Sequence, residues 1–327
     1  MLGTFLDKLN VFFDRRFMIA YWSPVFIGLG LAAGLVAILI RPSAALGWWT
    51  ARTGTEQILL GIGALLVITV LAYLLEALTI PVVRLYEGYW PKGWLTNWAS
   101  RRQKARIAKS IDSVRYHNFP LDSDLVKPTR LGNVLVASEE YPHQLYQLDA
   151  VLWWPRLAAL LPETFRTQVD TALTPVLAML NLSMMLTVLA FGGGIAVLLT
   201  NRLWWLLGAI FFGGFLLARV CYLAAVSQAV DYGESVRVAF DLYRHDILKQ
   251  MHIPLPDNLF KERLLWDLLN KWVYSYAPPW EIGTITNVPQ PTDPFYNDIH
   301  QSPAAPVQPQ EMILTIKDVP VVTLKHQ

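Results

Sequence analysis

The chain has a single cysteine, Cys221, among its 327 residues. One thiol cannot form a disulfide within the chain, so cysteine usage gives no sign of an oxidising compartment. Charged residues are also scarce: they make up 16% of the chain, against about 25% in soluble domains. Hydrophobic residues make up 54%. This balance argues against an ordinary soluble protein and is typical of a chain with much of its length in lipid.

Motifs of the well-known catalytic and cofactor sites are missing from the sequence. It has no Gly-x-x-x-x-Gly-Lys-Ser/Thr, no His-Glu-x-x-His, no Gly-x-Ser-x-Gly and no Cys-x-x-Cys. Among the six histidines, the closest pair is His245 and His252, which lie seven positions apart. That spacing is too long for both to bind one metal without a third ligand between them, so we interpret them as surface residues. The sequence therefore predicts a non-enzymatic protein without a cofactor.

Four long apolar runs are what the sequence has in abundance. About 20 mostly apolar residues span a hydrocarbon core about 30 Å thick, and each run reaches that length. A break of two polar residues, Asn201 and Arg202, separates the last two runs and leaves room only for a tight turn. The sequence thus predicts an all-α integral membrane protein with four transmembrane helices in two hairpins. The four runs are 17–40, 57–80, 173–200 and 203–230.

The apolar runs divide the chain into six predicted segments. Segment 1–16 has apolar residues at helical spacing, which predicts an interfacial helix or, equally well, a first helix packed on the soluble part. It carries charge before the first apolar run and no small-x-small site, so we expect no cleaved signal peptide. The other segments are hairpin one (17–83), a cytoplasmic helical domain (84–172), hairpin two (173–230), cytoplasmic helices (231–276) and a Pro-rich flexible tail (277–327).

The positive charges predict the orientation. Of 27 lysines and arginines, twelve lie in the loop between the second and third spans. The two short links between paired spans hold only Arg41, Arg52 and Arg202. Because cytoplasmic loops carry the excess of Lys and Arg, we expect both termini and the large loop in the cytoplasm. The expected location is the bacterial inner membrane.

A basic stretch follows the second span directly. No acidic residue lies between Glu87 and Asp112, and each cation near an anionic leaflet contributes about 1 kcal/mol. Nucleic-acid binding is the rival interpretation of a basic run. The neighbouring span and the row of tryptophans favour anionic lipid as the partner and argue against nucleic acid. The predicted lipid-binding residues are Trp90, Trp94, Trp98, Arg101, Arg102, Lys104, Arg106 and Lys109.

Two charged residues fall inside the apolar runs. Glu76 lies near the cytoplasmic end of the second span, and Arg219 lies toward the cytoplasmic end of the fourth. Such charges usually pair or line a wet cavity, so we expect either an interhelical ion pair or pore-lining residues. In the large loop, Asp122 and Asp124 form an Asp-x-Asp pattern that can hold a metal. The same pattern is common in turns, and without a βαβ context we expect no metal there.

One stretch resembles known proteins. Residues 129–162 read TRLGNVLVASEEYPHQLYQLDAVLWWPRLAALLP. Leu-Gly-Asn, a later Leu-Asp, then Trp-Pro-Arg-Leu and Leu-Pro make this stretch similar to uncharacterised bacterial multi-span membrane proteins. The resemblance covers about a tenth of the chain and implies no activity.

Three functions are compatible with these features. The first is a membrane protein that presents a cytoplasmic helical surface and its tail to partner proteins; residues 311–327 of the tail could add as a strand to a partner's sheet or simply fray. The second is an oligomeric channel or membrane-permeabilising effector, since the layout of spans is similar to bestrophin-type channels. The third is a membrane enzyme acting on lipid or sugar substrates through Asp122 and Asp124. The sequence favours them in that order.

Overall fold

A computed structural model describes residues 14–200 and 204–275 of the chain. Every regular element within these residues is a helix, which confirms the predicted all-α class. Four of the described helices are long and apolar enough to cross a membrane: Arg15–Ile40, Gly54–Ala77, Glu163–Thr200 and Trp205–Gln250. The Asn201–Arg202 break, the Pro-rich tail and all but the last residues of the predicted N-terminal helix lie outside the described residues.

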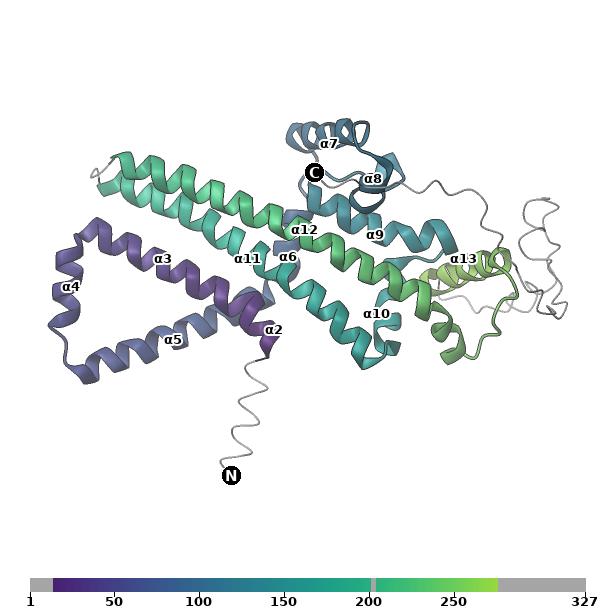
Figure 1. Cartoon of the computed structure of the whole chain (residues 1–327), viewed down its shortest axis with the longest axis horizontal. Coiled ribbons are helices and arrows are strands. Elements are labelled where there is room, and N and C mark those ends of the chain that lie inside the picture. The colour runs from purple at the N-terminus through teal and green to yellow at the C-terminus, as the bar shows by residue number, and fades with distance from the viewer. Residues whose placement is uncertain (1–13, 201–203, 276–327) are drawn as a thin grey trace, which may run out of the picture.

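The first apolar helix consists of α2 (Arg15–Phe17), one π-helical segment, η1 (Met18–Trp22), and α3 (Ser23–Ile40). Arg41 has a positive φ of 91° and ends it. The following link was expected to be short and polar, but most of it forms α4 (Pro42–Thr50), because Pro42 is well suited to the first turn of a helix. In Figure 1, α3, α4 and α5 (Gly54–Ala77) form the three sides of a triangle.

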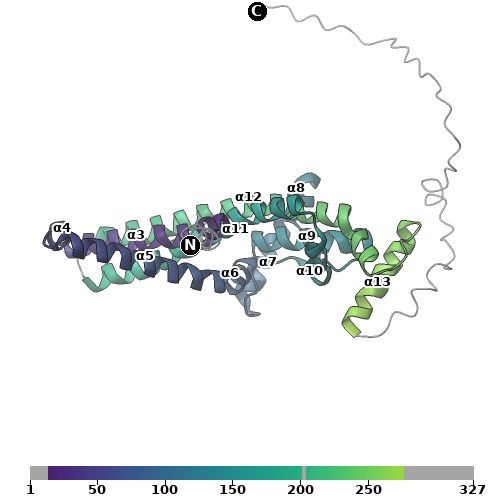
Figure 2. The same cartoon turned by 90° about the horizontal axis from the view of Figure 1, so that it is seen from below.

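The second pair of apolar helices packs closely. Helices α11 (Glu163–Thr200) and α12 (Trp204–Gln250) lie side by side in both views (Figures 1 and 2). Small residues permit this approach, since a Cβ added to Gly214 would lie 2.8 Å from Ala190 Cβ. Apolar residues recur at helical spacing beyond the fourth apolar run as far as Pro254 and Pro256, and a helix starting at Glu163 leads into the third, so the sequence predicts helices longer than the spans. The structure agrees: α11 passes through Pro175, and α12 ends at Gln250.

The remaining helices lie at the other end of the molecule. They are α6 (Thr79–Glu87), α7 (Trp94–Ile107), α8 (Asp112–Asn118), the short η2 (Ser123–Leu125), α9 (Arg130–Tyr146), α10 (Ala150–Leu160) and α13 (Leu259–Ser275). The break between α5 and α6 falls at Leu78, because Pro81 cannot donate to the carbonyl of Ala77. The residue before a proline disfavours helical backbone, so the sequence predicts that α9 ends at Tyr141, before Pro142. This prediction is wrong: α9 runs through Pro142, whose buried side chain packs within the fold.

Two apolar clusters join this end to the long helices. In one, Trp153 of α10 and Trp266 of α13 are fully buried beside Phe240 of α12, and the two indole rings lie 5.2 Å apart. In the other, Leu131 and Val134 of α9 pack against α11 and α12. Helices α9, α10 and α13 therefore share a core with α11 and α12.

Candidate functional site

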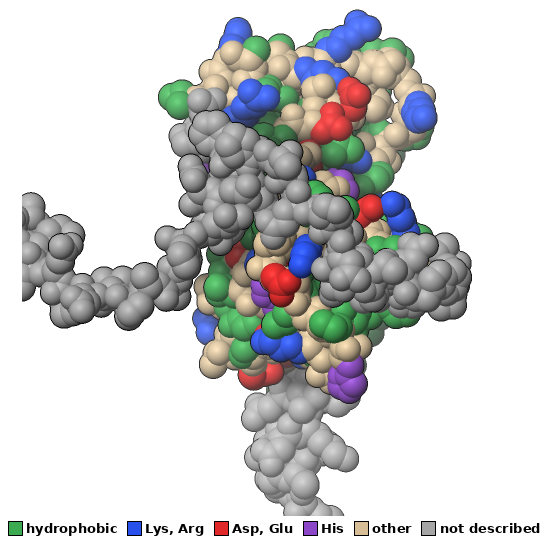
Figure 3. Space-filling view, turned by 90° about the vertical axis from the view of Figure 1, so that its right-hand side faces the viewer, with side chains coloured by type: hydrophobic (Ala, Val, Ile, Leu, Met, Phe, Trp, Pro, Cys, Tyr) green, Lys and Arg blue, Asp and Glu red, His purple; other side chains and the backbone are tan. Residues whose placement is uncertain are grey.

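A cavity of about 610 Å³ lies where α6, α7, α9, α11 and α12 meet. We call it the basic cavity, after the four arginines in its wall. The structure here brings together residues that the sequence predicts separately: Trp90, Trp98, Arg102 and Arg106 of the basic stretch, and Arg219 of the fourth span. Figure 3 shows Lys and Arg side chains over the upper lobe of the molecule, where α7 lies. The four arginines in the wall of the cavity are Arg102, Arg106, Arg130 and Arg219.

Two glycines place α6 and α9 around the cavity. Gly88 ends α6 with a φ of 90°, a conformation that glycine adopts without strain. Gly132, in the first turn of α9, lies so close to α6 that an added Cβ would overlap the carbonyl oxygen of Glu87. Thr129 caps α9, as predicted, by accepting a hydrogen bond from the Gly132 N–H (3.0 Å). The close approach of the two helices fixes the chain on both sides of α7.

Tyr222 of α12 connects the cavity to the long helices. Its hydroxyl accepts hydrogen bonds from the N–H groups of Arg130 (3.1 Å) and Leu131 (3.2 Å), two donors that the first turn of α9 leaves unpaired. Its ring stacks on that of Tyr86, with centroids 5.8 Å apart. The Tyr86 hydroxyl donates to Ser183 of α11 (3.0 Å). Four helices are thus tied together along one wall.

The charged side chains in the wall of the cavity are all positive among the described residues. Among the described residues that line it, four are arginines and none is acidic. Within the same part of the chain none of these arginines forms an ion pair; Arg102 lies 5.6 Å from the Trp98 ring centroid and Arg219 5.0 Å from that of Tyr222. Burial, followed by the nearby charges of Arg106 and Arg219, lowers the pKa of the Arg130 guanidinium. The arrangement lacks a counter-ion.

The predicted partnership of Glu76 and Arg219 is not formed in the described residues. Both side chains are exposed, and no ion pair joins them. Glu76 lies at the end of α5, whereas Arg219 borders the basic cavity. The described residues thus show no such ion pair, and the role of either residue in a pore stays a prediction.

The other predicted site residues lie outside the cavity. Trp94 is 76% exposed, and Arg101 is exposed on α7. Lys109 borders a smaller neighbouring recess, which shares Arg106 and Arg130 with the basic cavity.

The two loop aspartates contact each other and the neighbouring helix α7. The Asp122 carboxylate accepts a hydrogen bond from the Asp124 N–H (2.8 Å), and Lys104 lies 3.8 Å from the Asp124 carboxylate. Across residues 14–200 and 204–275, no group of three or more His, Cys, Asp or Glu side chains is placed to hold a metal. Both aspartates have the contacts of an ordinary turn.

Sequence reasoning missed Gln103, Arg130 and Tyr222. No local pattern marks them, because their partners are remote in the chain: Arg130 and Tyr222 are 92 positions apart. It also did not predict the contact of His245, whose side chain is 38% exposed and whose ring nitrogen lies 3.0 Å from the Glu262 carboxylate where α12 meets α13. That carboxylate also accepts from Arg244 (2.7 Å).

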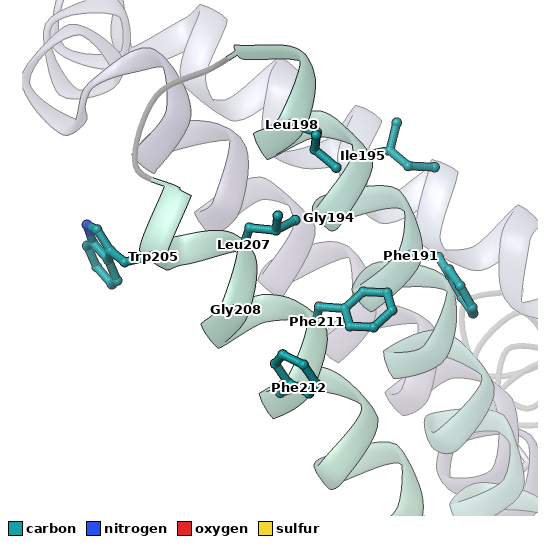
Figure 4. Close-up of a pocket in the computed structure, with 9 residues that line it drawn as sticks. All are labelled: Phe191, Gly194, Ile195, Leu198, Trp205, Leu207, Gly208, Phe211 and Phe212. Carbon is teal, nitrogen blue, oxygen red and sulfur yellow. The ribbon is translucent and has the colours of Figure 1, made fainter.

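A second pocket, of about 660 Å³, lies between α11 and α12 at the far end of the pair. Figure 4 shows side chains of both helices along it, among them Phe191, Leu207 and Phe211. Every residue in its wall is apolar, aromatic or glycine. Any acyl chain could fill such a surface, so we place the candidate site in the basic cavity.

Comparison of the chain with models of protein families, with curated proteins and with solved structures finds no match. The assignment of the site therefore depends on its own geometry: four arginines without counter-ions, held beside two tryptophans where long apolar helices meet a helical layer.

Proposed function

We propose that the chain is a non-enzymatic, multi-span protein of the bacterial inner membrane that presents a cytoplasmic helical surface to partner proteins. In this proposal α3 and α5 form one membrane hairpin and the apolar parts of α11 and α12 form the other. Helices α7 to α10, the end of α12, and α13 form the cytoplasmic domain. Both termini lie on the cytoplasmic side, and the Pro-rich tail adds a second contact for partners.

The continuity of α11 and α12 is the observation that supports this function best. Each helix begins or ends in an apolar stretch and runs without a break into the layer that holds the buried Trp153 and Trp266. The same layer carries exposed apolar side chains such as Leu242 (63% exposed) and Leu255 (46%). In this proposal a partner protein binds at these positions and covers the exposed side chains.

Site-directed cross-linking in living cells tests the proposal. A photoreactive residue at Leu242, exposed on the cytoplasmic part of α12, should give one discrete protein adduct. The matched control is Val220, which is 55% exposed on the apolar part of the same helix and should react with lipid. The proposal fails if Leu242 gives no protein adduct, or if both positions give the same products. A ring of several subunits that conducts ions in planar bilayers would instead favour the channel.

A further inference from the structure

We propose that the basic cavity binds the headgroup of an anionic phospholipid, with its phosphate among the four arginines and a headgroup hydroxyl on Gln103. The inference deepens the proposed function: it depends on a membrane location for the chain, and it gives the cytoplasmic domain a specific lipid rather than diffuse surface charge.

The charges identify the phosphate. Cations from three helices converge on one cavity: Arg102 and Arg106 from α7, Arg130 from α9 and Arg219 from α12. Mutual repulsion of guanidinium groups without counter-ions costs free energy, and a bound anion would remove that cost. The planar fork of an arginine matches the oxygens of a phosphate group. A divalent phosphate or a phosphodiester would satisfy this set.

The depth and the apolar wall identify an amphiphile. Arg219 lies about 22 Å along α12 from its start, at 1.5 Å per residue, within a hydrocarbon core about 30 Å thick. It is therefore close to the edge of the lipid, where phosphates lie. Leu85, Trp90, Leu95 and Trp98 form the apolar part of the wall, and tryptophans favour this interfacial depth. Acyl chains could leave the cavity along these side chains.

The side chain of Gln103 is the basis for proposing a hydroxyl on the ligand. Its side chain borders the cavity and is only 7% exposed. Its Nε2 donates to the carbonyl oxygen of Pro128 (3.4 Å), but its buried Oε1 has no hydrogen-bond partner within the described residues. A buried acceptor without a donor is costly. The terminal torsion of glutamine is soft, so a small rotation would turn Oε1 toward a donor. Four nearby arginines would repel an ammonium donor, which leaves a hydroxyl.

The test titrates the purified full chain in neutral detergent and counts bound lipid by native mass spectrometry. Phosphatidylglycerol carries one negative charge and two headgroup hydroxyls, and phosphatidylethanol carries the same charge without a hydroxyl. We expect phosphatidylglycerol to bind roughly tenfold more tightly, the effect of about one hydrogen bond to a buried acceptor. Gln103→Leu should abolish this preference. Equal binding of the two lipids by the wild-type chain would overturn the hydroxyl contact.

Two arginine variants separate a site from diffuse charge. Arg106→Gln removes a cation of the cavity, and Arg101→Gln removes an exposed cation from the same helix outside it. We expect roughly tenfold weaker binding for Arg106→Gln and nearly unchanged binding for Arg101→Gln. Arg219→Gln, at an exposed side chain on another helix, should behave like Arg106→Gln and guards against misfolding of a single variant. Equal effects of Arg101→Gln and Arg106→Gln would overturn the site.

A soluble competitor distinguishes the source of the phosphate. Glycerol 3-phosphate shares the phosphate and the hydroxyls but has no acyl chains, so it should not displace the lipid at equal concentration. Displacement would overturn the lipid assignment. Because the titration is done in detergent, its failure does not depend on the membrane orientation or on the protein partner that the proposed function requires.

Discussion

At the scale of single residues, an acidic side chain that no sequence pattern marks, Glu139, gives a prediction about how stability depends on pH. Glu139 of α9 is exposed, and it also lines a recess of about 190 Å³ between α9, α10 and α12. Trp154, Tyr232 and Phe240 form part of the wall. Desolvation in this recess, with a further contribution from the charge of Glu87, raises the pKa of Glu139 to about 7. Lys127 opposes the shift, and Asp149 adds to it.

The raised pKa predicts how stability changes with pH. A carboxyl group whose pKa rises on folding destabilises the folded chain once it ionises. That cost is absent below the unfolded pKa and grows as the pH rises toward about 7. The melting temperature in detergent should therefore fall more between pH 5 and pH 8 for the wild-type chain than for Glu139→Gln. We expect a small effect because water screens an exposed group.

A charge-matched control accompanies this measurement. Asp231→Asn removes an exposed carboxylate from α12 and should follow the wild-type pH dependence. If Glu139→Gln and the wild-type chain show the same pH dependence, the recess does not hold a perturbed carboxyl group.

At the scale of helices, the closest contact between α6 and α9 gives a sharp prediction. Gly132→Ala would drive a methyl group into the Glu87 carbonyl oxygen, and such overpacking costs about 1–3 kcal/mol. The control is Gly34→Ala in α3, where an added Cβ meets nothing within 4 Å. Alanine favours a helix by about 1 kcal/mol over glycine. In thermal unfolding, Gly132→Ala should lower the melting temperature, and Gly34→Ala should preserve or raise it.

The two outcomes of the glycine experiment have different meanings. An unchanged melting temperature for Gly132→Ala would show that α6 and α9 do not approach as described. A loss of stability for Gly34→Ala would show that something packs on α3 there, since Gly30 and Gly34 have open space beside them among the described residues.

The sequence predicts features that depend on local patterns better than features that depend on contacts between remote residues. Apolar runs and prolines are local, and they predict the four long helices and the passage of α11 through Pro175. The end of α9 was placed too early because a local rule for Pro142 was outweighed by burial in the fold. The sequence marks the basic stretch and Arg219 separately, but it does not predict that they line one cavity. The walls of the cavity come together through contacts between remote residues, such as Tyr222 with Arg130.

At the scale of the whole molecule, the orientation can be tested with the protein's own cysteine content. Cys221 is the only cysteine, so Cys221→Ala gives a background in which one introduced thiol reports one position. Ser43 of α4 and Ser123 of the large loop are both exposed. In intact cells a membrane-impermeant maleimide should label Ser43→Cys, and it should label Ser123→Cys only after permeabilisation. The reverse pattern would contradict the cytoplasmic assignment of the loop.

The length of α12 has a mechanical consequence. Its 47 residues give a rod of about 70 Å, of which about 30 Å fits within the hydrocarbon. The remaining 40 Å or so acts as a lever arm. A bilayer that thins or thickens changes the tilt of a helix that spans it. If the rod bends little, a change of about 10° would swing its distant end, with side chains such as Leu242, by roughly 7 Å. A partner bound there would sense the thickness of the surrounding bilayer.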